Sequence, residues 1–144
     1  MVIFDPTKEV PQLDLCKRLK ELGFPQEGGG YYWDLEDHNL SWVWAAEVRD
    51  SLIKAPTCRE LGEWLPMEVV EPDYKEVPDN NAISYLPFYS RRPDGKQWAY
   101  WYQNYYDDTL GNFYALADTE ADARARMLVW LAERGYVKFR ENTD

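Results

Sequence analysis

The most unusual stretch of this chain is WAYWYQNYY, from Trp98 to Tyr106. Six of its nine residues are aromatic, and they predict a β-strand that carries large rings on both faces. A sheet that is buried on one side needs only one apolar face. The second face therefore requires a cover, which can be the chain's own helices or loops, a protein partner or a small ligand.

The sequence before this stretch predicts the other strand of a hairpin. Residues 82–90 are joined to it by RRPDGK, whose Pro, Asp and Gly suit a type I turn with Gly in the left-handed conformation. We expect Arg92 to pair with Lys96, which would place Phe88 opposite Tyr100. The opposite face would then carry the candidate binding residues Tyr85, Tyr89, Trp101 and Tyr105.

A second hairpin is expected nearer the N-terminus. Two alternating runs place large residues at every second position: Tyr31, Trp33 and Leu35, then Leu40, Trp42 and Trp44. The polar residues 36–39 between them form the expected turn. If Leu35 lies opposite Leu40, every large residue falls on one face, as in a sheet that faces a core.

Three helices are expected, over about residues 10–22, 57–65 and 119–134. Each has apolar residues at helical spacing, and the first and last are followed directly by glycine. Thr57 and Glu60 have the spacing of a capping box at the start of the second helix. These helices can cover one side of the sheet.

Three further segments have weaker signals. Pro87 cannot donate a hydrogen bond to a neighbouring strand, which predicts an edge or an interruption. The segment Pro66–Asp79 is acidic and rich in proline, so we expect an extended surface connection with a brief strand at Met67–Val70. A short strand is expected at Tyr136–Arg140.

The composition limits the function classes. Among 144 residues, 26 are acidic and 16 basic, so the formal charge is −10 and direct nucleic-acid binding is not expected. No apolar run approaches the roughly 20 residues that span a membrane, and the start of the chain does not look like a secretory signal. We interpret Cys16 and Cys58 as buried reduced thiols, which favours a cytoplasmic protein.

No motif predicts catalysis, so we expect no catalytic residue, no metal and no cofactor. The sequences GxSxG and HExxH are absent, and nothing pairs His38 with a cysteine. The glycines at 28–30 lead into an aromatic strand, whereas a phosphate cradle leads into a helix. The cluster Asp34, Glu36, Asp37 and His38 has metal-ligating residue types, but its composition is that of a polar turn.

Several segments together carry a resemblance. KRLKELGFPQ, an aromatic hairpin, APTCRELGEWLP and DTEADARARMLVWLAERGYV resemble a group of small uncharacterised bacterial proteins, often found in phage or prophage-like settings. The resemblance covers most of the chain. It implies no activity and no functional residues.

We therefore expect a single α+β domain over residues 1–144, with an antiparallel sheet of two aromatic hairpins packed against about three helices. The leading hypothesis is a non-enzymatic interaction or accessory protein, whose face around Trp101 and Tyr105 binds a protein partner or a second copy. One alternative is a small-ligand binding protein or enzyme with a pocket between the aromatic sheet and the C-terminal helix, in which Asp34 or His38 supplies polar groups. Another is an acidic mimic of DNA.

Overall fold

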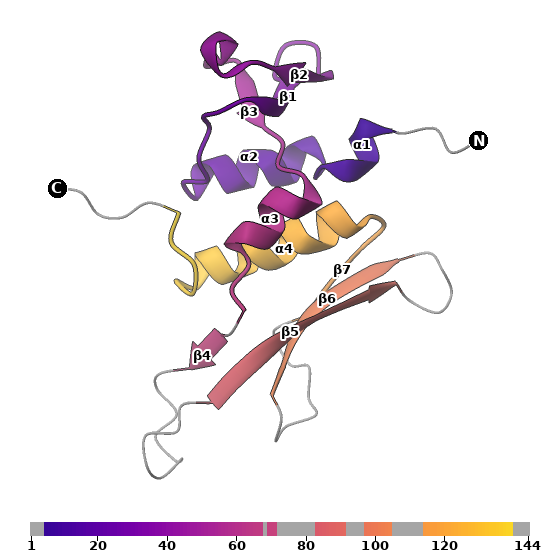
Figure 1. The fold of residues 1–144 in the computed structure, drawn as a ribbon, viewed down its shortest axis with the longest axis vertical. Helices are drawn as coiled ribbons and strands as arrows, with labels where there is room; N and C mark the ends of the chain where they lie inside the picture. Colours follow the sequence, from indigo (N-terminus) through magenta and orange to yellow (C-terminus); the bar gives the residue numbers. More distant parts are fainter. Residues whose placement is uncertain (1–4, 68, 72–82, 92–96, 105–113, 140–144) are drawn as a thin grey trace, which may run out of the picture.

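The chain forms two antiparallel sheets with helices between them (Figure 1). The computed structural model describes residues 5–67, 69–71, 83–91, 97–104 and 114–139. The helices are α1 (Pro6–Glu9), α2 (Leu13–Glu21), α3 (Cys58–Trp64) and α4 (Glu120–Glu133), with a 3-10 turn η1 (Ala45–Glu47). The first sheet has the order β2 (Leu40–Val43), β1 (Gly30–Asp34), β3 (Leu52–Lys54). The second has the order β4 (Val69–Glu71), β5 (Ile83–Arg91), β6 (Trp98–Asn104), β7 (Tyr114–Ala117).

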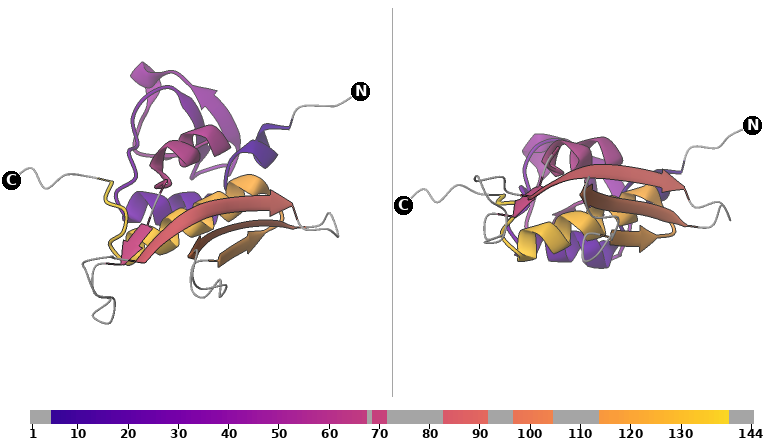
Figure 2. Two further views of the ribbon diagram at one scale, coloured as in Figure 1. Left: turned by 60° about the horizontal axis from the view of Figure 1, so that its bottom comes forward. Right: turned by 90° about the horizontal axis from the view of Figure 1, so that it is seen from below.

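The α+β class and both hairpins are confirmed, but the hairpins belong to separate sheets rather than to one. Hairpin β1–β2 lies in the first sheet, and hairpin β5–β6 lies in the second. Figure 2 shows α4 crossing the second sheet on the side that faces the first sheet. None of the described helices is both long and apolar enough to cross a membrane.

Local signals set the helix ends. After α2, Gly23 adopts a φ of 103°, and its N–H donates to the carbonyl of Lys20 at 3.0 Å. The N–H of Phe24 donates to the carbonyl of Leu19 at 2.9 Å, which completes a Schellman motif. The predicted start of this helix at about residue 10 is wrong. The helix α2 starts at Leu13, and a separate short helix, α1, ends at Glu9.

The predicted capping box of α3 is confirmed. The side chain of Thr57 accepts from the N–H of Glu60, and the carboxylate of Glu60 accepts from the N–H of Thr57. Thr119 precedes α4 and accepts from the N–H of Asp122 at 3.1 Å. The buried stripe of α4 also agrees with the helical spacing in the sequence and contains Ala121, Ala125, Leu128 and Leu131.

The first hairpin is two residues out of the predicted register. Trp33 lies opposite Leu40, and Tyr31 lies opposite Trp42. A shift of two residues keeps every side chain on its expected face. The expectation that all large residues share one face is wrong, because Tyr32 is fully buried on the opposite face. Both faces of β1 are therefore covered.

The second hairpin is one residue out of the predicted register. Phe88 pairs with Trp101, and Tyr89 pairs with Tyr100, while residues 92–96 of the expected turn lie outside the described chain. A shift of one residue moves the side chains of one strand to the other face relative to its partner. Tyr89 therefore shares a face with Tyr100, and Trp101 lies on the other face.

The position of Pro87 in the sheet, the acidic segment after α3 and the end of the chain differ in part from what the sequence predicted. Strand β5 lies between β4 and β6, but β4 pairs with it only at residues 83–85, so Pro87 lies beyond the end of β4. The strand expected at Met67–Val70 is β4, displaced slightly, and most of Pro66–Asp79 lies outside the described residues. Residues 136–139 form no strand.

The main core lies between the second sheet and the helices. Tyr100 and Tyr102 point toward α4 and are buried there together with Leu128. Phe139 closes the core near the C-terminus, since its ring centroid lies 5.3 Å from that of Phe24 and 5.2 Å from that of Trp64. Aromatic packing thus replaces the strand expected in this segment.

Candidate functional site

The four predicted binding residues do not form one face. Tyr89 lies on the same side of the second sheet as Tyr100, which faces α4, whereas Trp101 lies on the outer side. Tyr85 pairs with Asn104 along the backbone. Tyr105 lies outside the described residues. The single surface expected from the sequence is therefore divided, because the actual register differs from the predicted one by one residue.

Tyr89 is exposed and held by contacts within the chain. Its side chain is 57% exposed, and its ring stacks on that of Tyr100 with centroids 6.2 Å apart. The guanidinium of Arg124 lies 4.8 Å from the centroid of the Tyr89 ring, and it bonds to Glu120 at 2.9 Å. This arrangement places a cation–π contact beside α4.

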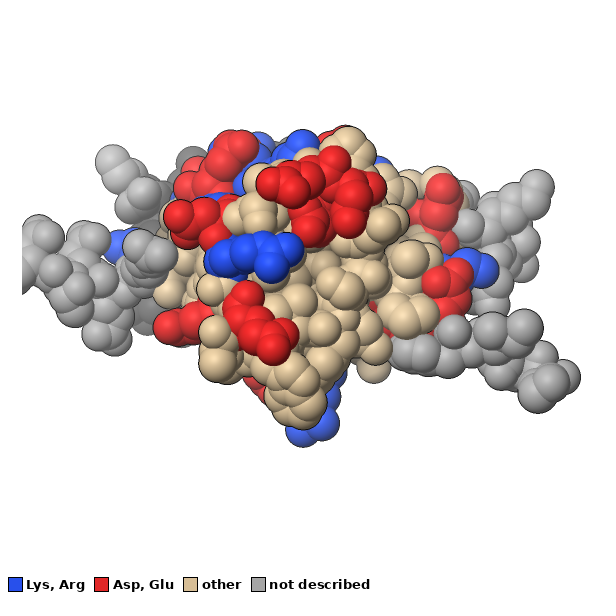
Figure 3. Space-filling view, turned by 90° about the horizontal axis from the view of Figure 1, so that it is seen from above, with Lys and Arg blue, Asp and Glu red and all other residues tan. Residues whose placement is uncertain are grey.

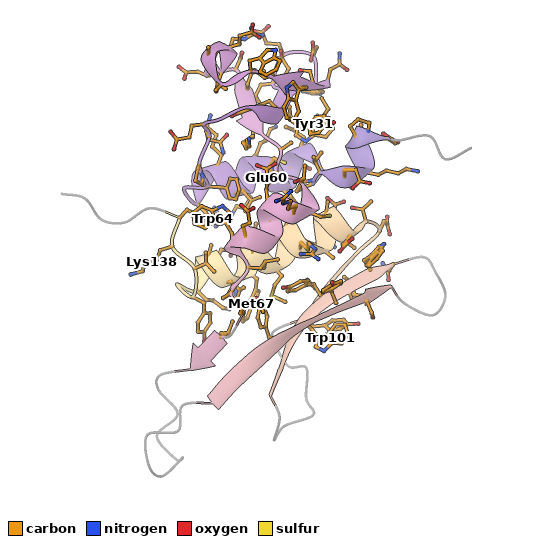
Figure 4. The ribbon with its side chains drawn as sticks, viewed as in Figure 1. Tyr31, Glu60, Trp64, Met67, Trp101 and Lys138 are labelled. Atoms are coloured by element: carbon orange, nitrogen blue, oxygen red, sulfur yellow. The ribbon has the colours of Figure 1, made fainter. Side chains whose placement is uncertain are left out.

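Trp101 forms the outer surface of the second sheet together with Tyr114. Their ring centroids lie 6.1 Å apart, and Trp101 is partly buried. Figure 4 shows Trp101 on the side of the sheet away from α4. Because Trp101 is not fully buried, its predicted role in an interface stays a prediction.

Two of the three most exposed aromatic rings among the described residues lie in or directly after the first hairpin, where the sequence predicted a core. Trp42 is 56% exposed and Trp44 is 67% exposed. Trp42 lies on the edge strand β2 and packs edge-on against Tyr31 at 5.3 Å. The core below β1 includes Trp33 and Leu40 but does not extend to Trp42. Exposed tryptophans at the edge of a rigid sheet are typical of binding surfaces.

Carboxylates dominate the sequence around these rings. Residues 27–51 contain one basic side chain, Arg49, and these six acidic ones: Glu27, Asp34, Glu36, Asp37, Glu47 and Asp50. Arg49 is itself paired with Asp34 at 3.5 Å. Figure 3, viewed from above the first sheet, shows several groups of acidic side chains on this end of the molecule, with basic side chains between some of them. We call Trp42, Trp44 and the exposed acidic residues of this segment, which exclude the partly buried Asp34, the tryptophan face.

A buried lysine fixes the loop beside the tryptophan face. The Nζ of Lys54 donates to the carbonyl of Gly29 at 3.0 Å and lies 3.5 Å from a carboxylate oxygen of Glu60. It also lies 5.0 Å from the centre of the Tyr32 ring, whose hydroxyl donates to the carbonyl of Gly28 at 2.7 Å. The glycines at 28–30 therefore form a fixed loop. Burial, helped by the nearby acidic side chain of Glu60, raises the pKa of Tyr32.

A groove lies between β7 and α4, the pair of elements that the small-ligand alternative named. Its volume is about 390 Å³, and we call it the β7–α4 groove. It is lined by Tyr114, Ala115, Leu116, Arg126, Met127 and Trp130. Asp34 and His38 are not among its lining residues. The volume lies near the lower end of the range for small-molecule sites, which is about 300–1,000 Å³.

The candidate metal ligands form a turn. The carboxylate of Asp34 accepts from the N–H of Glu36, and that of Asp37 accepts from the N–H of Asn39, each at 2.8 Å. His38 adopts a φ of 59°, as turn residues can. Within the described ranges, no three Asp, Glu, His or Cys side chains are placed to hold a metal ion.

Both cysteines are free thiols. Cys16 is buried, and burial strongly raises its pKa. Cys58 is only partly buried, and burial together with Glu120 raises its pKa to about 11. A thiol with a raised pKa is mostly protonated at neutral pH, so neither cysteine has the character of an activated nucleophile.

Comparisons with known proteins give no match to a family model, a curated protein or a solved structure. A function for this chain must therefore be inferred from the geometry of the described residues.

Proposed function

We propose that this protein is a non-enzymatic interaction protein that binds a positively charged segment of a partner protein on the tryptophan face. The exposure of Trp42 and Trp44, 56% and 67%, is the observation that supports it. An aromatic side chain buries about 150–250 Å² when covered, so covering the exposed half of one ring gains about 2–3 kcal/mol at about 25 cal/mol/Å². Two such rings provide a hydrophobic centre for an interface.

The charge of the tryptophan face selects the chemistry of the partner. Its acidic residues repel anions and attract Lys or Arg side chains, which also stack on indole rings. Cation–aromatic contacts already occur elsewhere in the described chain. Arg134 lies 4.0 Å from the ring of Trp130, and Lys54 lies 5.0 Å from the ring of Tyr32. A basic segment of a partner can make the same contacts with Trp42 and Trp44.

The test uses a fluorescein-labelled hexa-arginine amide peptide, titrated with the protein in a buffer of low salt. We expect Trp42→Ala and Trp44→Ala each to weaken binding by about 5–30-fold, as is usual for interface tryptophans. Met67→Ala is the matched control, because Met67 is an exposed apolar side chain on another part of the chain. Binding should weaken when the salt concentration rises from 50 to 200 mM.

A second pair of variants separates the local charge from the net charge. Glu47→Gln removes a carboxylate of the tryptophan face, whereas Glu63→Gln removes an exposed carboxylate of α3. We expect only Glu47→Gln to weaken binding. If Trp42→Ala and Trp44→Ala bind as tightly as the wild type, or if the two Glu variants weaken binding equally, the tryptophan face is not the site.

Two expectations from the sequence lead to separate tests. A role of the outer sheet face predicts that Trp101→Ala abolishes capture of a specific partner from the native host. An origin in a phage-like element predicts phage genes beside the coding gene, which inspection of the genome neighbourhood checks. The alternative of a small-ligand binding protein is favoured by the position of the β7–α4 groove.

A further inference from the structure

Arg126 brings a positive charge to the β7–α4 groove. Its Nη1 donates to the carbonyl of Leu116 at a distance of 2.6 Å, and within the described part of the chain it forms no ion pair. Arg18, Arg49 and Arg124, in contrast, each pair with a carboxylate. A guanidinium has five N–H donors, so Arg126 retains donors for a ligand.

The same hydrogen bond argues against a peptide as the occupant. Strand β7 is the last strand in the described order of the second sheet, and an added strand would need the outward carbonyls of β7 as acceptors. The carbonyl of Leu116 already accepts from Arg126. An added strand would have to share this acceptor with the Arg126 side chain, so the groove suits a ligand that binds Arg126 and leaves the edge of β7 unpaired.

The rest of the lining is mostly apolar and aromatic. Tyr114 is 38% exposed and lines the groove from the edge strand β7, and Trp130 lines it from α4. Trp130 is fixed by the ring of Tyr136, whose centroid lies 6.3 Å away in a nearly parallel plane, and by the guanidinium of Arg134 at 4.0 Å. Rings that are held in place before binding lose little freedom when a flat ligand packs on them.

We propose that the β7–α4 groove binds a small, flat aromatic anion. The ring of the ligand packs on the side chains of Tyr114 and Trp130, and its carboxylate or sulfonate accepts hydrogen bonds from Arg126. The groove involves neither Trp42 nor Trp44, so this site is independent of the proposed partner-binding function. Since the groove is open to solvent, we expect dissociation constants on the order of tens of micromolar.

The test compares two fluorescent probes of similar shape. 8-Anilino-1-naphthalenesulfonate carries a sulfonate, and N-phenyl-1-naphthylamine is its uncharged analogue. We expect Arg126→Gln to weaken binding of the sulfonate by about fivefold or more, because it removes a charge-assisted hydrogen bond, and to leave the uncharged probe nearly unaffected. Arg59→Gln is the matched control, since Arg59 is an exposed arginine of α3.

Two further measurements locate the probe. Tyr114→Ser removes an aromatic wall and should weaken binding of both probes, even if Arg126→Gln does not fold. In ¹H–¹⁵N spectra of the wild type, the sulfonate should shift the indole N–H signal of Trp130 and leave those of Trp42 and Trp44 in place. Circular dichroism confirms that each variant is folded.

Three outcomes would overturn the proposal. The first is equal binding of the sulfonate to Arg126→Gln and Arg59→Gln. The second is a probe-induced shift at Trp42 or Trp44 without one at Trp130. The third is no binding of the sulfonate at a concentration of 1 mM. The first and third outcomes have no bearing on the hexa-arginine experiment, whereas the second would also contradict the charge selectivity proposed for the tryptophan face.

Discussion

The close approach of the Lys54 side chain to Gly30 predicts how much stability an added methyl group at residue 30 would cost. A Cβ at residue 30 would lie 2.6 Å from the Nζ of Lys54, and the φ of Gly30 is 150°. The end of a lysine side chain usually moves at little cost, but Lys54 is 4% exposed and donates to the carbonyl of Gly29. Gly30→Ala must therefore displace a buried cation as well as strain the backbone.

The cost of Gly30→Ala has two parts. An Ala at a positive φ costs about 1–2 kcal/mol. Displacing the Lys54 ammonium from its partner breaks a hydrogen bond made by a buried charged group, which costs about 1–3 kcal/mol. We expect a total loss of about 2–5 kcal/mol, which is a large share of the stability of an ordinary domain.

Urea unfolding, followed by tryptophan fluorescence, measures these costs. Gly28→Ala is the matched control, because Gly28 has a φ of 87° and its added Cβ would meet nothing within 4 Å. Its cost should be the backbone part alone, about 1–2 kcal/mol. The side chain of Met is one atom shorter than that of Lys, so Lys54→Met removes the contact at 2.6 Å and leaves the next one, at 3.6 Å.

A double-mutant cycle then isolates the contact. In the Lys54→Met background, Gly30→Ala should cost no more than Gly28→Ala does, which gives a coupling of about 1–3 kcal/mol between residues 30 and 54. The reasoning is refuted if Gly30→Ala costs the same in both backgrounds. It is refuted equally if Gly30→Ala and Gly28→Ala destabilise the wild type to the same extent.

Three further changes test the remaining structure. Asp122→Ala should lower the free energy of unfolding in urea by about 1–3 kcal/mol, because it removes the carboxylate that accepts from the Gln12 N–H at 2.8 Å. Asp122→Asn should cost less, since its amide oxygen can still accept this bond. Tyr102→Phe should cost about 1–2 kcal/mol, because its hydroxyl donates to the carbonyl of Pro66 at 2.7 Å. The pKa of Cys58 is raised to about 11 in the folded chain, so its contribution to stability is complete below about pH 9 and is lost as the pH rises to about 11. Cys58→Ser should therefore reduce the loss of stability that urea unfolding measures between about pH 9 and 11.

The parts of the fold that depend on local signals could be predicted from the sequence. Gly23 and Gly135 end helices because they tolerate the positive φ values of 103° and 81°. Thr57 and Thr119 begin helices because their side chains accept from backbone N–H groups two or three residues inside the helix. Each signal acts over a few residues and does not depend on what packs around it.

Strand pairing could be predicted only approximately, because several registers satisfy the same alternating pattern. The shift of two residues between β1 and β2 changed the neighbours of Trp33 but not its face. The shift of one residue between β5 and β6 separated Tyr89 from Trp101 and so divided the predicted site. The larger shift thus left every side chain on its face, whereas the smaller one divided the site, because the side chains of a strand alternate with a period of two residues.

The exposure of Trp42 and Trp44 could not be read from the pattern, because alternation shows which residues share a face but not what covers it. Trp33 and Trp42 share a face of the first sheet, and the core below β1 includes only Trp33. Coverage depends on where α1 and α2 end relative to β2, which is set by contacts such as that of the Trp33 indole N–H with the carbonyl of Pro11 at 3.0 Å. In this chain two of the tryptophans that the pattern assigned to a core, Trp42 and Trp44, are instead exposed.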